Sequence, residues 1–187
     1  MNTKNQIIIA SSLVMSIAGV VIVIANIKRM TQSIRGTLGR SYFTIDELCS
    51  SSTAKKLGID NKPTPDIEVK LQALIDNVLN PIREQYGSYI LVNSGYRCDK
   101  LNKAVGGASS SQHTKGEAAD ITGGNVERNR KIFQLIAESG VYDQLIWENG
   151  GAWIHVSYSG NNRRQMLAYN GSNYANITNN WQSVINA

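Results

Sequence analysis

Hydrophobic and polar positions divide the chain into an apolar N-terminal run and a longer mixed region. Residues 7–27 read IIIASSLVMSIAGVVIVIANI and contain no charged side chain. At about 1.5 Å per residue, a helix of this length spans the roughly 30 Å hydrocarbon core of a bilayer. We therefore predict a transmembrane helix over residues 7–27 within a membrane anchor of residues 1–30. A cleaved signal peptide is the alternative, but its apolar region is shorter, about 7–15 residues.

A polar linker over residues 31–40 is followed by helical patterns in the first half of the remaining chain. Thr44 to Glu47 reads as a capping box and predicts the start of a short helix. Thr64-Pro65-Asp66 predicts a second helix start, and Pro81 should bend or end that helix. Its apolar positions recur on one face, at Ile67, Leu71, Leu74, Ile75, Val78 and Ile82.

Strand and helix patterns alternate over the rest of a domain that we place at residues 41–169. We expect strands near residues 89–93, 118–122, 144–147, 153–158 and 165–169, a helical turn at 98–105, and a helix over 126–139 capped by Gly140. Short connections between the last strands predict antiparallel pairing. The expected fold class is therefore α+β, a small antiparallel sheet with flanking helices. Residues 170–187 should form a loosely attached polar extension, with Trp181 and Val184 as the side chains that would dock it.

Charge distribution argues against nucleic-acid binding. Five of the 19 basic residues and none of the 14 acidic residues lie in residues 1–40, so the remainder is formally neutral. A nucleic-acid module would carry a basic face. The two cysteines, Cys49 and Cys98, are too few for a disulfide-rich scaffold; they are either buried thiols or one bridge.

The only two histidines of the chain, together with one aspartate, form the candidate chemical site. His113 lies in a loop of small and polar residues, and Asp120 follows at the start of an apolar strand. His155 lies in a predicted strand whose alternation places Trp153, His155 and Ser157 on one face. Two imidazoles and one carboxylate are the set expected of catalytic zinc with an open fourth position, although ferrous iron takes the same ligands.

These residues also carry a resemblance to a known family. Five short elements occur in the order found in one group of enzymes. They are Ser94-Gly-Tyr-Arg97, Leu101-Asn102, Gly106-Gly107, the block from Ser111 to Asp120 (SQHTKGEAAD) and Trp153-Ile-His155. The chain resembles the zinc D-alanyl-D-alanine carboxypeptidases and endopeptidases, including VanY-type and VanX-type enzymes, over roughly residues 41–169. Its sequence is most similar to those of small single-domain members from bacteria and their phages. The expected fold is related to that of hedgehog-like proteins.

The resemblance implies a Zn²⁺ ion held by His113, Asp120 and His155, and a role for Arg97 near the scissile carbonyl. Many family members place a glutamate three residues before the last histidine, where this chain has Ala152. We therefore predict Glu148 as the general base, because a turn at 149–151 would return it beside the His155 strand. Asp143 is the second candidate.

Four further residues are expected to support the site: Ser111 and Gln112 by orienting His113 or contacting substrate, Asp143, and Ser157 by lining the cleft. The expected function is zinc-dependent hydrolysis of peptide bonds in bacterial peptidoglycan, as a carboxypeptidase, an endopeptidase or a phage endolysin. The alternative is a catalytically inactive, zinc-containing cell-wall-binding module. We expect a monomer anchored in the inner membrane with its domain facing the cell wall, although Lys and Arg counts around the apolar run favour the opposite orientation.

Overall fold

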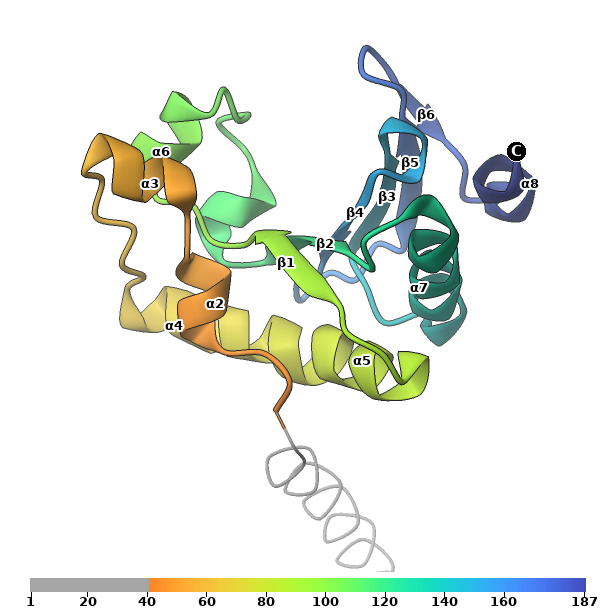
Figure 1. Ribbon diagram of the computed structural model, residues 1–187, viewed down its shortest axis with the longest axis horizontal. Coiled ribbons are helices and arrows are strands. Elements are labelled where there is room, and N and C mark those ends of the chain that lie inside the picture. The colour runs from red at the N-terminus through yellow and green to blue at the C-terminus, as the bar shows by residue number, and fades with distance from the viewer. Residues whose placement is uncertain (1–40) are drawn as a thin grey trace, which may run out of the picture. The chain divides into compact units, whose positions relative to one another are not determined.

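A six-stranded mixed sheet organises residues 41–187, the part of the chain that this computed structural model describes (Figure 1). The strand order is β1-β2-β4-β3-β5-β6. The strands are β1 (Leu91–Ser94), β2 (Ala118–Thr122), β3 (Gln144–Glu148), β4 (Trp153–Ser157), β5 (Gln165–Tyr169) and β6 (Tyr174–Asn176). The predicted transmembrane helix at 7–27 lies outside the described residues. Within 41–187, no helix has the length and apolar character needed to cross a bilayer.

Helices surround the sheet, and the longest of them pack together with one of its faces. They are α2 (Ile45–Cys49), α3 (Ser52–Leu57), α4 (Pro65–Leu74), the π-helical η1 (Ile75–Leu79), α5 (Asn80–Tyr86), α6 (Asp99–Ala104), α7 (Val126–Ser139) and α8 (Trp181–Asn186), with single 3-10 turns at η2 (Gln112–Lys115) and η3 (Asn149–Gly151). Segments α4, η1 and α5 follow one another without interruption and lie beside β1 (Figure 1). The π-helical turn precedes Pro81, whose ring cannot fit a regular helix interior.

Alternation along the strands gives the sheet one apolar face and one polar face. Ile121, Leu145, Trp147, Ile154 and Val156 belong to the buried core with residues of α4, η1, α5 and α7. The ring of Phe133 on α7 meets Trp147 edge to face, 5.5 Å between centroids. Because successive side chains of a strand point to opposite sides, the residues between these core positions face away from the helices.

The predicted elements mostly agree with the structure. The strand at 118–122, the strand at 165–169 and the helix at 126–139 have the predicted bounds, and Gly140 ends that helix in a left-handed conformation. The Thr44 hydroxyl accepts from the backbone N–H of Glu47, as the capping box requires. Thr64 precedes the helix that begins at Pro65, but its hydroxyl makes no capping hydrogen bond.

The expectation of a wholly antiparallel sheet is wrong at one strand pair. All other pairs are antiparallel, but β5 pairs with β3 in parallel. After β4, residues 158–164 cross over β3, so that β5 pairs with the edge of β3 opposite the edge that β4 occupies. Asp143, at the entrance to β3, fixes this connection: its carboxylate accepts from the backbone N–H of Arg163 at 2.9 Å and from Arg163 Nη2 at 2.7 Å.

The prediction of a loosely attached extension over residues 170–187 is also wrong. Strand β6 pairs with β5, and α8 packs beside α7 (Figure 1). Ile177 and Ile185 are buried, and the Nε of Arg130 on α7 donates to the backbone carbonyl of Ile185. Trp181 and Val184 also pack against the core, as expected of the side chains that would dock this segment.

The Asp143–Arg163 pair makes the stability of the fold depend on pH. Hydrogen bonds from the Arg163 side chain outweigh burial and hold the pKa of Asp143 well below its usual range. A carboxyl whose pKa is lower in the folded than in the unfolded chain stabilises the fold above the unfolded value of about 3.9, and this stabilisation is lost as the pH falls through the folded pKa.

We expect Asp143→Asn to lower the free energy of unfolding at pH 7 by about 1–3 kcal/mol, because charge-assisted hydrogen bonds are lost and Arg163 is partly solvated. The difference in unfolding free energy between variant and wild type should narrow as the pH falls below about 4, because the unfolded wild-type chain then binds a proton at Asp143 before the folded chain does. Urea unfolding at several pH values measures this. Glu127→Gln, which breaks an exposed pair with Lys131 on α7, is the control and should change little. A difference that stays constant down to pH 2 would contradict the assignment.

Candidate metal centre and active-site cleft

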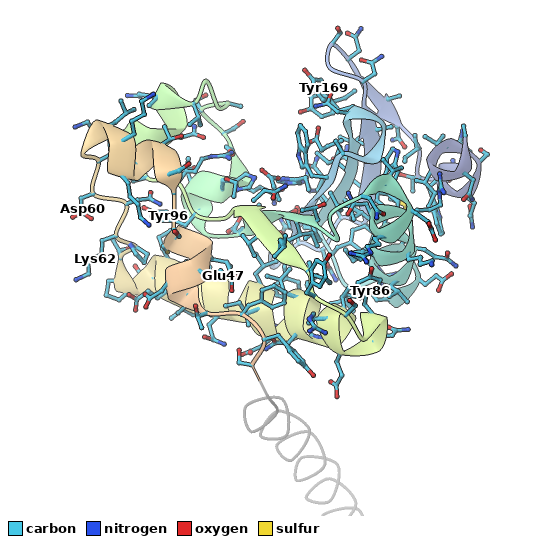
Figure 2. The ribbon with its side chains drawn as sticks, in the orientation of Figure 1. Glu47, Asp60, Lys62, Tyr86, Tyr96 and Tyr169 are labelled. Atoms are coloured by element: carbon cyan, nitrogen blue, oxygen red, sulfur yellow. The ribbon has the colours of Figure 1, made fainter. Side chains whose placement is uncertain are left out.

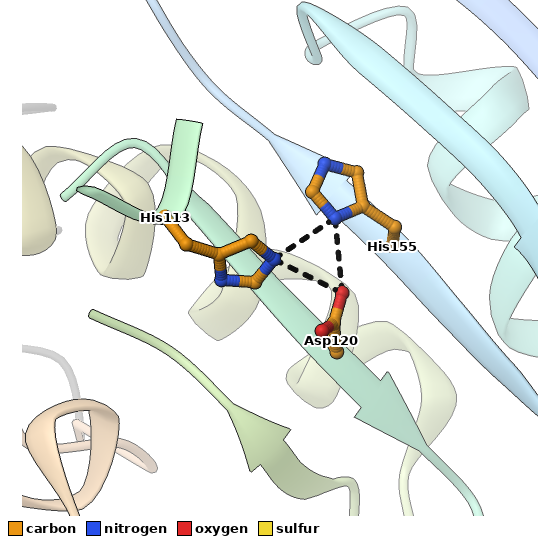
Figure 3. A group of neighbouring side chains, drawn as sticks. All are labelled: His113, Asp120 and His155. Carbon is orange, nitrogen blue, oxygen red and sulfur yellow. Dashed lines mark hydrogen bonds and ion pairs between the residues drawn. The ribbon is translucent and has the colours of Figure 1, made fainter. Parts of the chain in front are cut away.

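Three side chains from distant parts of the chain converge at the polar face of the sheet (Figure 3). His113 comes from η2, Asp120 from β2 and His155 from β4. The Nε2 atom of His113 lies 3.2 Å from Nδ1 of His155 and 3.2 Å from Oδ1 of Asp120, and the last two atoms are 2.9 Å apart. The predicted metal-ligand set is thus assembled, with three potential ligand atoms aimed at one point.

Sheet register explains how Asp120 and His155 meet. β2 pairs with β4 so that Asp120 lies directly opposite His155. Directly paired residues project to the same face of a sheet with their Cβ atoms about 4.5–5.5 Å apart. The pairing alone therefore brings one carboxylate and one imidazole together.

His113 is oriented by the loop that follows β1. Its Nδ1 lies 2.7 Å from the backbone oxygen of Gly95, to which it donates, and this fixes Nε2 as the free nitrogen toward the cluster. The backbone N–H of Arg97 in turn donates to the carbonyl of His113. Gly95 is needed here, because a Cβ at that position would lie 2.2 Å from the carbonyl oxygen of Leu48.

The three ligand atoms fit a metal ion. Bonds of about 2.0–2.1 Å in tetrahedral geometry place neighbouring ligand atoms about 3.3 Å apart, close to the separations of 2.9–3.2 Å seen here. Burial by itself would raise the pKa of Asp120, but the charges and hydrogen bonds of His113 and His155 hold it well below its usual range. Asp120 is therefore ionised, as a metal ligand must be.

A cleft of about 980 Å³ opens over the cluster. The two histidines and Asp120 lie in its wall together with Arg97, Ser111 and Glu148. Three hydrogen bonds hold the guanidinium of Arg97: Nη1 to Ser94 Oγ at 2.9 Å, Nε to Asn102 Oδ1 at 3.2 Å and Nη2 to Ser111 Oγ at 3.3 Å. Its Nη1 lies 3.9 Å from Asp120 Oδ2. Two of its five N–H groups remain for another acceptor.

Glu148 lies in the same cleft, where the predicted turn brings it. η3 forms the turn at 149–151, and β3 and β4 pair so that Glu148 opposes Trp153 and Ile146 opposes His155. Glu148 and His155 are therefore diagonal neighbours on the polar face. The Glu148 side chain is buried, and burial raises the pKa of its carboxyl, an effect that His155 partly offsets.

The other predicted site residues, Ser111, Gln112 and Asp143, make different contacts. Ser111 caps η2 and accepts from the backbone N–H of His113. Gln112 lines the cleft, but its amide donates to Asp143 Oδ2. Asp143 is bound by Arg163 and does not line this cleft, so its geometry does not support the expectation of a second candidate base.

Ser157 is fully buried and bonds with the backbone of Gln144 at the end of the sheet. It does not line the cleft, so the geometry does not support the expectation that it forms part of the cleft wall.

Three residues in or beside the cleft were given no role by sequence reasoning. Asn102 is 3% exposed and joins Arg97 to the 106–108 loop by donating to the carbonyl of Ala108. Its place in the Leu101-Asn102 element of the family resemblance is the signal that could have identified it. Tyr169 and Tyr174 also line the cleft, and the polar composition around Tyr174 concealed its place in the sheet.

Two imidazoles and one carboxylate that could hold one metal ion, beside a second carboxylate and a held arginine, are the set of groups that a metal-dependent hydrolase uses. The family model described as Peptidase M15 matches residues 41–157, more than half of the chain. The chain therefore belongs to the peptidase M15 family, which confirms the resemblance found in the sequence. A comparison with curated proteins finds no match.

We expect His113→Ala and His155→Ala each to abolish binding of a divalent ion, because two remaining ligands cannot hold it in this geometry. Metal content after dialysis should be near one ion per wild-type chain and near zero per variant chain. Added Zn²⁺ should raise the melting temperature of the wild type only, since an ion stabilises the state that binds it. Asp99→Ala, which removes an exposed carboxylate outside the cleft, should behave as wild type. Equal metal content in all four proteins would exclude this site.

Proposed function

We propose that the protein is a zinc metallopeptidase that hydrolyses peptide bonds in bacterial peptidoglycan. The observation that carries this proposal is the convergence of His113, Asp120 and His155 with Glu148 in one cleft of a peptidase M15 domain. Membership of a peptidase family supports hydrolysis, and the family resemblance of the motifs supports wall peptides that contain D-amino acids.

The protein residues divide the chemistry among them. His113, Asp120 and His155 would hold a zinc ion, which when bound would supply Lewis acidity toward a peptide carbonyl and water. Glu148 takes the proton of the attacking water and returns it to the leaving amine, so that one C–O bond forms and the C–N bond breaks. Its burial and raised pKa suit both transfers. Arg97 donates to the carbonyl oxygen as negative charge develops there.

We expect Glu148→Gln to keep the metal and to lower kcat by about 10²–10⁴-fold, because the amide cannot accept the proton. The assay incubates the purified full-length protein with peptidoglycan and with a peptide ending in D-Ala-D-Ala, and it identifies products by mass spectrometry. Asp143→Asn is the matched control: it removes a buried carboxylate outside the cleft and should retain the chemistry below its melting temperature. Full activity in Glu148→Gln would refute the assignment of the base.

The same assay tests Arg97. Arg97→Lys keeps a positive charge but loses the planar fork that Ser94, Asn102 and Ser111 hold. We expect kcat to fall about 10²–10³-fold with a much smaller change in KM, since the lost hydrogen bond forms in the transition state. A change in KM alone would assign Arg97 to substrate binding instead.

A zinc-containing wall-binding module is the second candidate function. It is favoured by Ala152, which stands where many relatives have the glutamate. If this candidate is correct, the wild-type protein will hold zinc and bind purified peptidoglycan without cleaving it. Product analysis with the wild type therefore separates the two functions before any variant is made.

We also propose that residues 1–30 anchor the protein in the inner membrane with the domain on the cell-wall side. The uncharged run at 7–27 supports the anchor, and a substrate outside the cytoplasm supports the orientation. Membrane fractionation and protease treatment of spheroplasts measure both. The domain should fractionate with membranes and be digested from outside. Protection from external protease would reverse the proposed orientation.

A further inference from the structure

Four cleft residues form one row across four adjacent strands. The strand pairings place Trp153 opposite Glu148, Glu148 beside Tyr169, and Tyr169 opposite Tyr174. Partners in register lie on the same face of the sheet, and all four residues line the cleft. The row next to it contains Asp120, His155, Ile146 and Leu167. The proposed base thus lies within an aromatic row that runs away from the metal ligands toward β6.

The far end of this row is a preformed aromatic surface. The rings of Tyr169 and Tyr174 stack with centroids 4.5 Å apart and planes 29° from parallel. Tyr169 projects from the β5–β6 hairpin (Figure 2). Tyr174 is 58% exposed, an unusual exposure for a large aromatic side chain that also lines a cleft. The stack therefore has one ring supported by the protein and one ring open to a ligand.

The hairpin that carries the two rings is fixed on both sides. At its turn, Oδ1 of Asn170 accepts from the backbone N–H groups of Ser172 and Asn173. Behind it, the backbone N–H of Ile177 donates to Met166, and the Ile177 side chain is buried. Ordering such a surface in advance reduces the entropy that a ligand must pay on binding.

This surface lies outside the part of the chain that the family model matches, which ends at residue 157. Strands β5 and β6 nevertheless supply one wall of the cleft, through Gln165, Leu167, Tyr169 and Tyr174. The family match covers the metal ligands and Glu148, whereas this wall belongs to the remainder of the chain. Selection among substrates is a role that suits a wall added to a common reaction centre.

We propose that Tyr169 and Tyr174 form a substrate-positioning platform that binds an extended peptide about three residues from the bond that is cleaved. Strands lie about 4.8 Å apart, so Tyr174, two strands from Glu148, is about 10 Å away along the row. An extended peptide advances about 3.3 Å per residue and covers that distance in about three residues. The inference rests on the proposed peptidase function and makes oligopeptides, rather than dipeptides, its substrates.

Tyrosine suits this task because its ring buries a large apolar area while its hydroxyl stays hydrated, and because only two torsions must be fixed. A contact so far from the reacting atoms is made equally in the ground state and the transition state. Its loss should therefore raise KM and leave kcat nearly unchanged.

The test compares Tyr174→Ala with the wild type on three synthetic peptides that contain the bond identified in the wall digest. One peptide holds only the two residues of that bond with blocked ends, and each of the others extends it by three residues on one side. We expect KM to rise about tenfold for one extended peptide. The other extended peptide and the short one should change less than twofold.

Two further variants keep the result interpretable. Tyr174→Phe preserves the stack and should retain most of the affinity for the extended peptide. Tyr89→Ala removes another exposed tyrosine, which contacts Arg128 outside the cleft, and should match the wild type on all three peptides. Metal content and melting temperature are measured for each protein, so that loss of the site or of the fold is detected directly.

The inference is overturned if Tyr174→Ala affects all three peptides equally or none of them. It is also overturned if only sugar-bearing wall fragments lose affinity while the bare extended peptides do not, because the platform would then bind the glycan. Failure of the proposed function has a different signature: the wild type itself would hydrolyse no wall substrate, and no bond would be identified.

Discussion

The pairing of β2 with β4, in the register that sets Asp120 opposite His155, is the constraint on which the site depends. In a strand, a slip of one residue moves every side chain to the other face. Such a slip would place Asp120 or His155 in the apolar core among Ile121, Ile154 and Val156, where an unpaired carboxylate is very costly. The packing of the core therefore enforces the register, and the register assembles two of the three ligands. Stability and function share this one pairing.

The third ligand depends on a different device, because His113 lies on a loop. Its ring is held by a single backbone oxygen, that of Gly95, and its own carbonyl is held by the N–H of Arg97. The backbone of the Ser-Gly-Tyr-Arg segment thus holds His113, and the same segment places the Arg97 side chain in the cleft. One short segment therefore holds two cleft residues in place, the histidine and the arginine.

The sequence predicted the helices and strands whose formation depends on neighbouring residues in the chain. Helix α7 has an amphipathic sequence and a terminal glycine, and β2 is a short apolar strand, so both were predicted to the residue. The parallel pairing of β5 was not predictable in this way, because it is a contact between distant segments, and the ion pair at its entrance, between Asp143 and Arg163, joins residues twenty positions apart. The docking of the tail was hidden for a related reason: its apolar side chains, among them the buried Ile177 and Ile185, are scattered without a regular period in a segment rich in Asn, Ser and Gly.

The position of the proposed base follows from the geometry of one hairpin. Many relatives place a glutamate at the position of Ala152, just before β4, whereas this chain has its carboxylate at Glu148, the last residue of β3. Both positions flank the turn at 149–151, and the backbone N–H of Ala152 donates to the carbonyl of Glu148. A proton acceptor is selected by its distance from the reacting atoms and not by its place in the sequence. Since Glu148 shares the polar face with His155, a carboxylate at the end of β3 lies in the same cleft as the metal-ligand set, and this geometry is the reason for proposing Glu148 as the base despite Ala152.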